Sequence, residues 1–401
     1  MERASTDWAG VGFGVGLGVL AAYQQFKLAP ALPLLLPQLG DDRLLAGLLM
    51  SVFAIAGLVL SVPVGRLQAR SGPAPLVALA LSSMLVGNVL ALVPPVTGLG
   101  LLASRTAEGI AFTVMAIAGA VIATESAAPR TRPLAVALWA SWVPFGQVLA
   151  VAVAAPSVAA GAWRPLWLVA VALTVAAGGL CWYRFGFAAL RLRYRSRRPA
   201  PRGPAPANGF RGGVGGPVWL AAGLFMLWSL QFMAFMTWLP QYLVEAHGLA
   251  PGRAVLAYAV PPLLSIVGNL VAGAALRAGL GVVSLLVPMF AIQALVWLLL
   301  PWTASGWSGV ASLAAWGLAS GATATGLFAM PYALADHAES PSQAYAALLT
   351  GRNVGVLFGP VLVPALISLA GGWGLVGPIF GLLTALLAVA VLPLGRSVAK
   401  V

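Results

Sequence analysis

The sequence predicts an all-α membrane protein with twelve transmembrane helices in two pseudo-symmetric six-helix bundles. First, 61% of the 401 residues are hydrophobic and only 8% are charged, whereas soluble domains average about 25% charged residues. Second, apolar runs recur along the whole chain, and each approaches the roughly 20 residues that a helix needs to cross the hydrocarbon layer. Third, an arginine-rich stretch without apolar periodicity, 190–216, divides the chain near its middle.

The expected spans follow one another with short connections that are rich in proline and glycine, such as Pro94-Pro95 and Gly371-Gly372. They cover residues 10–36, 44–65, 74–93, 98–123, 134–158, 164–187, 217–243, 254–276, 280–301, 309–335, 344–369 and 374–394. We therefore expect an N-terminal bundle over 1–189, a linker over 190–216 and a C-terminal bundle over 217–401.

Basic residues predict the orientation, because cytoplasmic segments of membrane proteins are enriched in Lys and Arg. With both termini inside, the outer segments contain only Arg43, Arg164 and Arg253. The inner segments then contain Arg3, Arg66, Arg70, Arg130, Arg132, Arg184, Arg191, Arg193, Arg195, Arg197, Arg198, Arg202, Arg211, Arg277, Arg396 and Lys400. The expected location is a bacterial-type inner membrane, with both termini cytoplasmic.

The linker has two interpretations. It can be a solvated topology anchor, or it can rest on anionic membrane lipids. Its charge does not indicate a nucleic-acid partner, because the arginines cluster in one loop between spans. The two halves also repeat weakly. Gln24 and Pro33 are matched 207 positions later by Gln231 and Pro240, and such repeats are a known construction of secondary transporters.

Two motifs resemble those of the major facilitator superfamily. After the second span stands Gly65-Arg66-Leu67-Gln68-Ala69-Arg70-Ser71-Gly72, similar to the family's loop signature but with Ala69 at the aspartate position. The fourth span carries Arg105-Thr106-Ala107-Glu108-Gly109, which resembles the family's intramembrane arginine motif. The stretch 101–170 is similar to the cyanate and nitroimidazole permease-like branch. This resemblance implies transport of a small, often anionic or polar solute.

The polar group Tyr23-Gln24-Gln25-Phe26-Lys27 lies inside the first apolar span. A lysine at a helix centre costs roughly 2.5–3.5 kcal/mol on insertion scales. Helical spacing places Tyr23, Gln24 and Lys27 on one face, which we interpret as lining a solute cavity. The alternative is that Lys27 lies higher and extends to the headgroups.

Arg105 and Glu108 are three residues apart on one predicted helix, so their side chains can pair directly. One interpretation is a structural ion pair. The other gives Glu108 a proton-coupling role, because it is the one acid predicted near mid-membrane, with Arg105 beside it contributing to solute binding.

Arg352 and Asn353 lie in the eleventh span among Gly351, Gly355 and Gly359. Either Arg352 lines the cavity, where its planar donor fork suits a carboxylate or a similar anion, or it pairs with the inner surface. Together with Lys27 and Arg105 it gives three interior cations against one interior acid, an excess that an anionic solute would offset. Trp142, Gln231 and Trp238 are further candidates for solute contact.

These residues predict a secondary transporter, not an enzyme. It would move a small organic or pseudohalide anion by alternating access, driven by protons or a counter-solute. We expect no cofactor and no metal, because the chain has one cysteine, Cys181, and no nucleotide-binding loop. We expect a monomer. The alternatives are an exporter of hydrophobic drugs and a non-transporting membrane sensor or assembly factor with the same fold.

Overall fold

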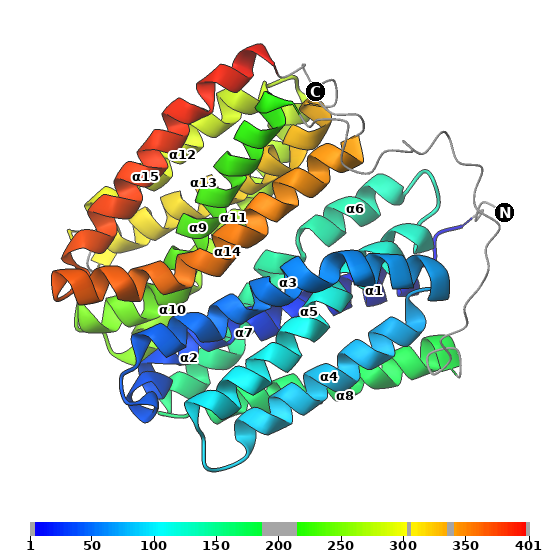
Figure 1. The fold of residues 1–401 in the computed structure, drawn as a ribbon, viewed down its shortest axis with the longest axis horizontal. Coiled ribbons are helices and arrows are strands. Elements are labelled where there is room, and N and C mark those ends of the chain that lie inside the picture. Colours follow the sequence, from blue (N-terminus) through cyan, green and yellow to red (C-terminus); the bar gives the residue numbers. More distant parts are fainter. Residues whose placement is uncertain (1–4, 187–214, 303–305, 335–340, 398–401) are drawn as a thin grey trace. The chain divides into compact units, whose positions relative to one another are not determined.

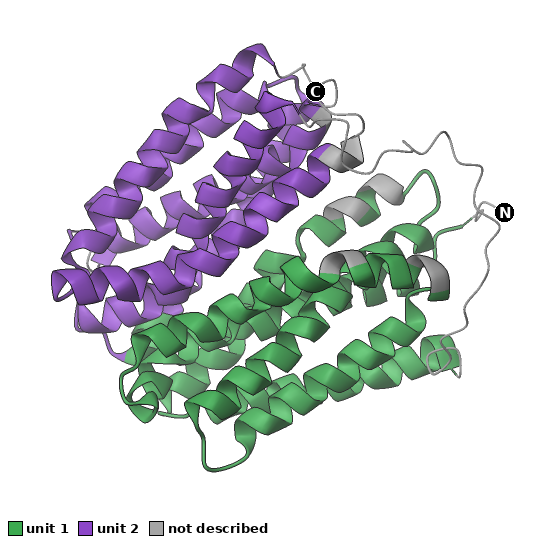
Figure 2. Cartoon of the chain, viewed as in Figure 1, with its two compact units in different colours: residues 1–198, 251–255 green, residues 199–250, 256–401 purple. Residues whose placement is uncertain are grey.

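The computed structural model describes residues 5–186, 215–302, 306–334 and 341–397. Within these ranges, twelve helices are long and apolar enough to cross a membrane, so the predicted fold class is confirmed. The chain divides into two compact units, residues 1–198 with 251–255 and residues 199–250 with 256–401 (Figure 2). Most of the linker expected over 190–216 lies outside the described residues.

The first unit contains the helices of the N-terminal half (Figure 1). They are α1 (Trp8–Phe26), α2 (Leu28–Leu35), η1 (Leu36–Leu39), α3 (Arg43–Ser71), α4 (Ala74–Leu92), α5 (Gly98–Ser126), α6 (Arg132–Ala140), α7 (Trp142–Ala159) and α8 (Arg164–Phe185). Helix α5 packs against α1, α3 and α4, while α1 also packs against α7 and α4 against α8. This arrangement makes α5 the centre of the unit.

The second unit is built in the same way. It contains α9 (Gly216–Glu245), α11 (Val260–Arg277), α12 (Val282–Leu299), α13 (Gly306–Ala333), α14 (Pro341–Ala370), η4 (Trp373–Leu375), α15 (Val376–Ala390) and η5 (Leu392–Arg396). Helix α10 (Pro251–Tyr258) is divided, with residues 251–255 in the first unit and the rest in the second. Helix α13 packs against α11 and α12, α12 against α15, and α9 against α14. Four of the five packed pairs of the first unit therefore have counterparts in the second, as the weak sequence repeat indicates, whereas α9 and α13, the counterparts of α1 and α5, contact one another less.

Short polar side chains start several of these helices. The carboxylates of Asp7 and Asp42 each accept a 2.9 Å hydrogen bond, from the backbone N–H of Gly10 and of Leu45. The hydroxyl of Thr97 accepts one from the N–H of Gly100 at 3.0 Å. These caps satisfy N–H groups that the first helical turn leaves without partners.

Three of the predicted spans are each divided into two α-helices, and a proline explains each of these breaks. Helices α1, α6 and α10 end at Phe26, Ala140 and Tyr258. Four residues further along stand Pro30, Pro144 and Pro262. Proline has no N–H to donate to the carbonyl four residues before it, and its ring clashes with that carbonyl. The spans expected as single helices over 10–36, 134–158 and 254–276 are therefore pairs of helices.

The closest helix packing in the second unit depends on glycine. A Cβ atom at Gly355 of α14 would lie 2.0 Å from the carbonyl oxygen of Met226, and one at Gly359 would lie 2.3 Å from that of Leu230. Both carbonyls belong to α9, so any larger residue would push the two backbones apart. These glycines therefore allow the two helices to approach closely.

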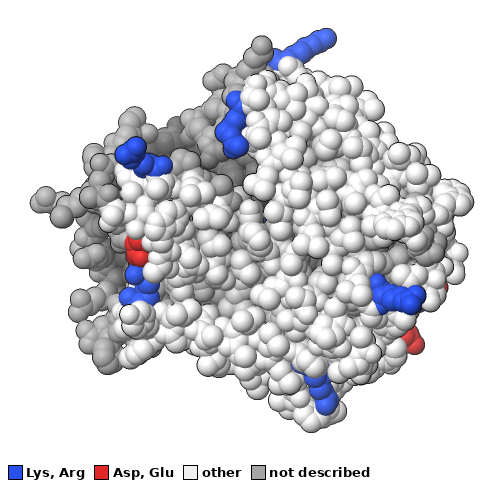
Figure 3. Space-filling view, turned by 180° about the vertical axis from the view of Figure 1, so that it is seen from behind, with Lys and Arg blue, Asp and Glu red and all other residues white. Residues whose placement is uncertain are grey.

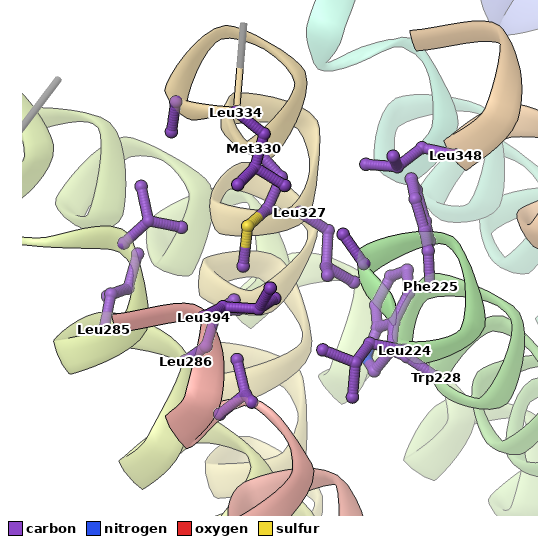
Figure 4. Packing of buried hydrophobic residues seen from close by; sticks show 14 of the residues in the cluster. Leu224, Phe225, Trp228, Leu285, Leu286, Leu327, Met330, Leu334, Leu348 and Leu394 are labelled. Atoms are coloured by element: carbon purple, nitrogen blue, oxygen red, sulfur yellow. The ribbon is translucent and has the colours of Figure 1, made fainter. Parts of the chain in front are cut away.

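The core of the second unit is apolar (Figure 4). It includes Leu224, Phe225 and Trp228 from α9, together with residues of α12, α13, α14 and η5 that fill the space between these helices: Leu285, Leu286, Leu327, Met330, Leu334, Leu348 and Leu394. Most side chains visible on the face in Figure 3 carry no charge, as expected of a surface that meets lipid.

Candidate functional site

The candidate site lies at the break between α1 and α2. Lys27 is the single residue between the two helices, and its side chain is completely buried. Beside it, Gln24 is also completely buried and Gln25 nearly so. The sequence-based placement of Lys27 in the interior is therefore correct, and the alternative in which it extends to the headgroups is wrong.

The Lys27 ammonium has a full set of hydrogen-bond acceptors. Its Nζ donates to Oε1 of Gln24, to Oδ1 of Asn88 and, over 2.9 Å, to Oε1 of Glu108. An ammonium group has three N–H donors, so none remains without an acceptor. Nζ also lies 4.7 Å from the centre of the Trp167 ring, a favourable arrangement for a buried cation.

Glu108 is shared between two cations. Its Oε1 accepts from Lys27, and its Oε2 accepts from NH1 of Arg105 at 2.6 Å. All three side chains are completely buried. The predicted pairing of Arg105 with Glu108 within α5 is confirmed.

Arg105 also holds the backbone around the helix break. Its NH1 and NH2 donate to the carbonyl oxygens of Gln24 and Gln25 at 2.6 and 3.0 Å. Its Nε donates to the carbonyl of Leu49, in α3, at 3.1 Å. Arg105 therefore links α5 to both α1 and α3 while it binds Glu108.

Helix α4 approaches this network through Gly87 and Asn88. A Cβ atom at Gly87 would lie 2.7 Å from the Ser104 carbonyl oxygen and 2.9 Å from Cγ of Glu108, so only glycine fits here. The Asn88 amide is fixed because its Nδ2 donates to the carbonyl of Met84 at 2.8 Å, which leaves Oδ1 for Lys27.

The ion network carries an unbalanced charge. Lys27 and Arg105 are cations and Glu108 is the anion that both contact, so the formal charge of the three is +1. Removing an ion from water costs several kcal/mol even after relaxation. The hydrogen bonds described above offset part of that cost, but they do not cancel the net charge.

The remaining predicted residues of the first unit, Tyr23 in α1 and Trp142 at the start of α7, do not join the network's hydrogen bonds. Tyr23 is buried, and its hydroxyl donates to the carbonyl of Leu166 at 2.7 Å. Trp142 is half-buried, and its ring stacks on that of Trp139 with 5.5 Å between centroids.

In the second unit, Gln231 belongs to a neutral network. Its Nε2 donates to Oε1 of Gln293 at 2.9 Å, and its Oε1 accepts from Nε1 of Trp297 at 2.7 Å. Gln293 in turn donates to Oγ1 of Thr323 at 2.8 Å and accepts from Nε1 of Trp228 at 3.1 Å. These side chains join α9, α12 and α13.

The other predicted residues of this unit do not touch that network. Trp238 is buried, and its Nε1 donates to the carbonyl of Pro360 at 2.8 Å. Arg352 is half-buried, and its NH1 donates to Oδ1 of its neighbour Asn353 at 3.1 Å.

Sequence reasoning missed six residues of these networks: Asn88 and Trp167 in the first unit, and Trp228, Gln293, Trp297 and Thr323 in the second. Asn88 and Gln293 are the only amide side chains in the spans 74–92 and 282–299. A single amide in an otherwise apolar span could have identified each of them as a member of a buried polar network. Trp167 is completely buried and lies under Lys27. Among the described residues, no group of three or more His, Cys, Asp or Glu side chains is placed to hold a metal ion.

Among the described residues, twelve spans in two units, each with a buried polar network, define a multi-pass membrane protein. Residues 15–342 match the model of the Major Facilitator Superfamily, and the chain belongs to that family. It is therefore a multi-pass membrane transporter, not an enzyme. A search among curated proteins found no match.

A similar solved structure is that of a bacterial homologue of the human lysosomal transporter Spinster, in an inward-facing and unoccupied conformation. It has a TM-score of 0.70 and 14% sequence identity, and the match covers 99% of this chain and 96% of the other. At this level of identity the similarity supports the fold alone.

Proposed function

We propose that this protein transports a small anionic solute by alternating access and couples that movement to protons or to a counter-solute. The observation that carries the proposal is the formal +1 charge of the completely buried set Lys27, Arg105 and Glu108. A buried excess of positive charge is costly without a compensating anion. Protonation of Glu108 would raise this excess to +2, and a solute with one negative charge would return it to +1.

Further cationic and polar groups support the same substrate class. Arg352 is half-buried within α14 and its guanidinium contacts Asn353, so it offers a second donor fork in the other unit. The similarity of 101–170 to the cyanate and nitroimidazole permease-like branch agrees with a small organic or pseudohalide anion. We further propose that both termini face the cytoplasm of a bacterial-type inner membrane, that the linker contacts anionic lipids, and that the protein acts as a monomer.

Glu108 is the proposed proton site. Arg105 cannot lose its proton under ordinary conditions, whereas a carboxylate can gain one. Protonation of Glu108 would remove the negative charge that Lys27 and Arg105 share. Protonation of Glu108 therefore raises the net positive charge of the site and strengthens its attraction for an anion.

A thermal-shift screen of the purified protein tests the substrate class. We expect cyanate, formate or nitrate to raise the melting temperature, and we expect Lys27→Gln to abolish that effect. Arg164→Gln is the control, because Arg164 is an exposed cation at the start of α8 and should not alter anion binding. Equal stabilisation of the wild type and of Lys27→Gln by the anions would contradict the proposal, as would stabilisation by hydrophobic cations alone.

A further inference from the structure

The saturated coordination of Lys27 limits how an anion can bind there. Its three donors are occupied by Gln24, Asn88 and Glu108. An incoming anion therefore has to take the place of one of these acceptors, since the ammonium has no fourth donor.

Glu108 is the acceptor that an anion can replace while Gln24 and Asn88 remain hydrogen-bonded to Lys27. Asn88 is held through its own bond to the Met84 carbonyl, and Gln24 lies on α1 one turn before Lys27. Both are neutral amides whose acceptor strength does not change with pH. Glu108 is a carboxylate, and a proton converts it into a neutral group that no longer competes for the cation.

Two unpaired donors beside Lys27 also indicate an acceptor ligand. Nε2 of Gln24 and Nε1 of Trp167 are buried without a hydrogen-bond partner. Gln24 binds Lys27 through its other amide atom, and the Trp167 ring lies under the ammonium. Leaving such donors unpaired destabilises the folded protein, and an oxyanion beside Lys27 would supply the missing acceptor.

We propose that Glu108 and the solute anion occupy the same position on Lys27 in turn, so that the protein carries one proton with each monovalent anion. This inference rests on the proposed function. With Glu108 ionised and no solute, the set Lys27, Arg105 and Glu108 has a formal charge of +1. With Glu108 protonated and the anion bound, the formal charge is again +1. The proton and the anion enter and leave together, so the cycle moves no net charge.

The groups around Lys27 are compatible with this exchange. Titratable side chains come from α5, as Arg105 and Glu108, and from α1, as Tyr23, whose hydroxyl is bonded to the Leu166 carbonyl. Among the described residues that contact Lys27, α4 and α8 contribute the non-titratable Asn88 and Trp167. Arg105 keeps its carbonyl partners on α1 and α3 when Glu108 is neutral.

Proteoliposomes containing the full chain test the charge balance with labelled formate and labelled cyanate as probes. A pH gradient, acid outside, is imposed at zero membrane potential, and a potassium–valinomycin potential is imposed at equal pH. We expect the pH gradient to drive accumulation approaching about tenfold per pH unit and the potential alone to drive none. Accumulation that follows the potential and ignores the pH gradient would overturn the inference and leave the proposed function intact.

The variant Glu108→Gln tests whether Glu108 is the residue that binds the transported proton. This variant should lose accumulation driven by the pH gradient but retain exchange of labelled for unlabelled anion. Glu125→Gln is the matched control, since Glu125 is an exposed acid near the end of the same helix, and it should behave like the wild type. Retained pH-driven accumulation in Glu108→Gln would overturn the inference. Absence of any flux or exchange of either anion in the wild type would instead overturn the proposed function, and with it this inference.

Discussion

Gln231 donates a 2.9 Å hydrogen bond from its Nε2 to Oε1 of Gln293. Gln231 lies in α9, 207 positions after Gln24 in α1, and Gln24 accepts from Lys27 in the first unit. Corresponding spans of the two units therefore each place a buried glutamine in a polar network. The network in the first unit contains ions, whereas that in the second is neutral and joins amide, hydroxyl and indole groups.

Gln293→Leu should destabilise the second unit. Gln293 is completely buried, and its Oε1 accepts from both Trp228 and Gln231, so leucine would leave two buried donors without a partner. Each such group costs about 1–3 kcal/mol. The melting temperature of the purified variant in detergent should fall clearly. Thr350→Val, at an exposed threonine of α14 in the same unit, should change it little, and an unchanged melting temperature for Gln293→Leu would argue against a structural role for the network.

Gly355→Ala should interfere with the packing of α14 on α9. The added Cβ atom would lie 2.0 Å from the Met226 carbonyl oxygen, and backbone atoms cannot move aside as a flexible side chain does. Overpacking of this kind typically costs 1–3 kcal/mol or more, so we expect a lower melting temperature and less folded protein on size-exclusion chromatography. Gly223→Ala in α9 is the matched control, because the space around that position is open. Two variants of equal stability would show that the helix contact tolerates a methyl group.

The fold could be predicted almost completely from the sequence, because hydropathy specifies where helices cross a membrane. The breaks were missed for a local reason. The sequence shows a proline four residues after each break, at Pro30, Pro144 and Pro262. The predicted spans nevertheless continue through Phe26, Ala140 and Tyr258, where the helices end.

The candidate site could be predicted only in part. The pairing of Arg105 with Glu108 follows from helical spacing within one element. The contact of Lys27 with Asn88 and Glu108 joins three helices, and spacing along one chain segment does not determine which faces of separate helices meet. Sequence reasoning therefore treated Lys27 as an open anion site, whereas the structure shows it with all three donors occupied.

His247 should make stability depend on pH. It follows α9, outside the spans, and its Nε2 lies 3.0 Å from the Tyr242 hydroxyl oxygen. Partial burial lowers the pKa of His247 below its ordinary value of 6.5. The unfolded chain therefore binds a proton at this residue more readily than the folded protein does, so this contribution is present above about pH 6.5 and is lost as the pH falls below it.

The melting temperature of the wild type should consequently drop more between pH 8 and pH 5 than that of His247→Asn, which cannot titrate in this range. Because both proteins share every other titratable group, the difference between their pH profiles reports His247 alone. Identical profiles would show that the protonation of His247 does not affect folding.

Asn88→Asp should reduce anion binding by supplying the missing negative charge within the protein. Oδ1 of Asn88 already accepts from Lys27, so a carboxylate at this position would pair with the ammonium at almost unchanged geometry. With Glu108 protonated, the buried set would then carry a formal charge of +1 instead of +2, so it would attract a solute anion less strongly. We expect the concentration of cyanate or formate needed for half-maximal stabilisation to rise about tenfold or more, equivalent to about 1.4 kcal/mol of binding free energy.

The control is Asn269→Asp, which makes the same substitution at a half-buried residue of α11 in the second unit and should leave anion binding unchanged. Unaltered affinity in Asn88→Asp would mean that the net charge around Lys27 does not determine which solute binds.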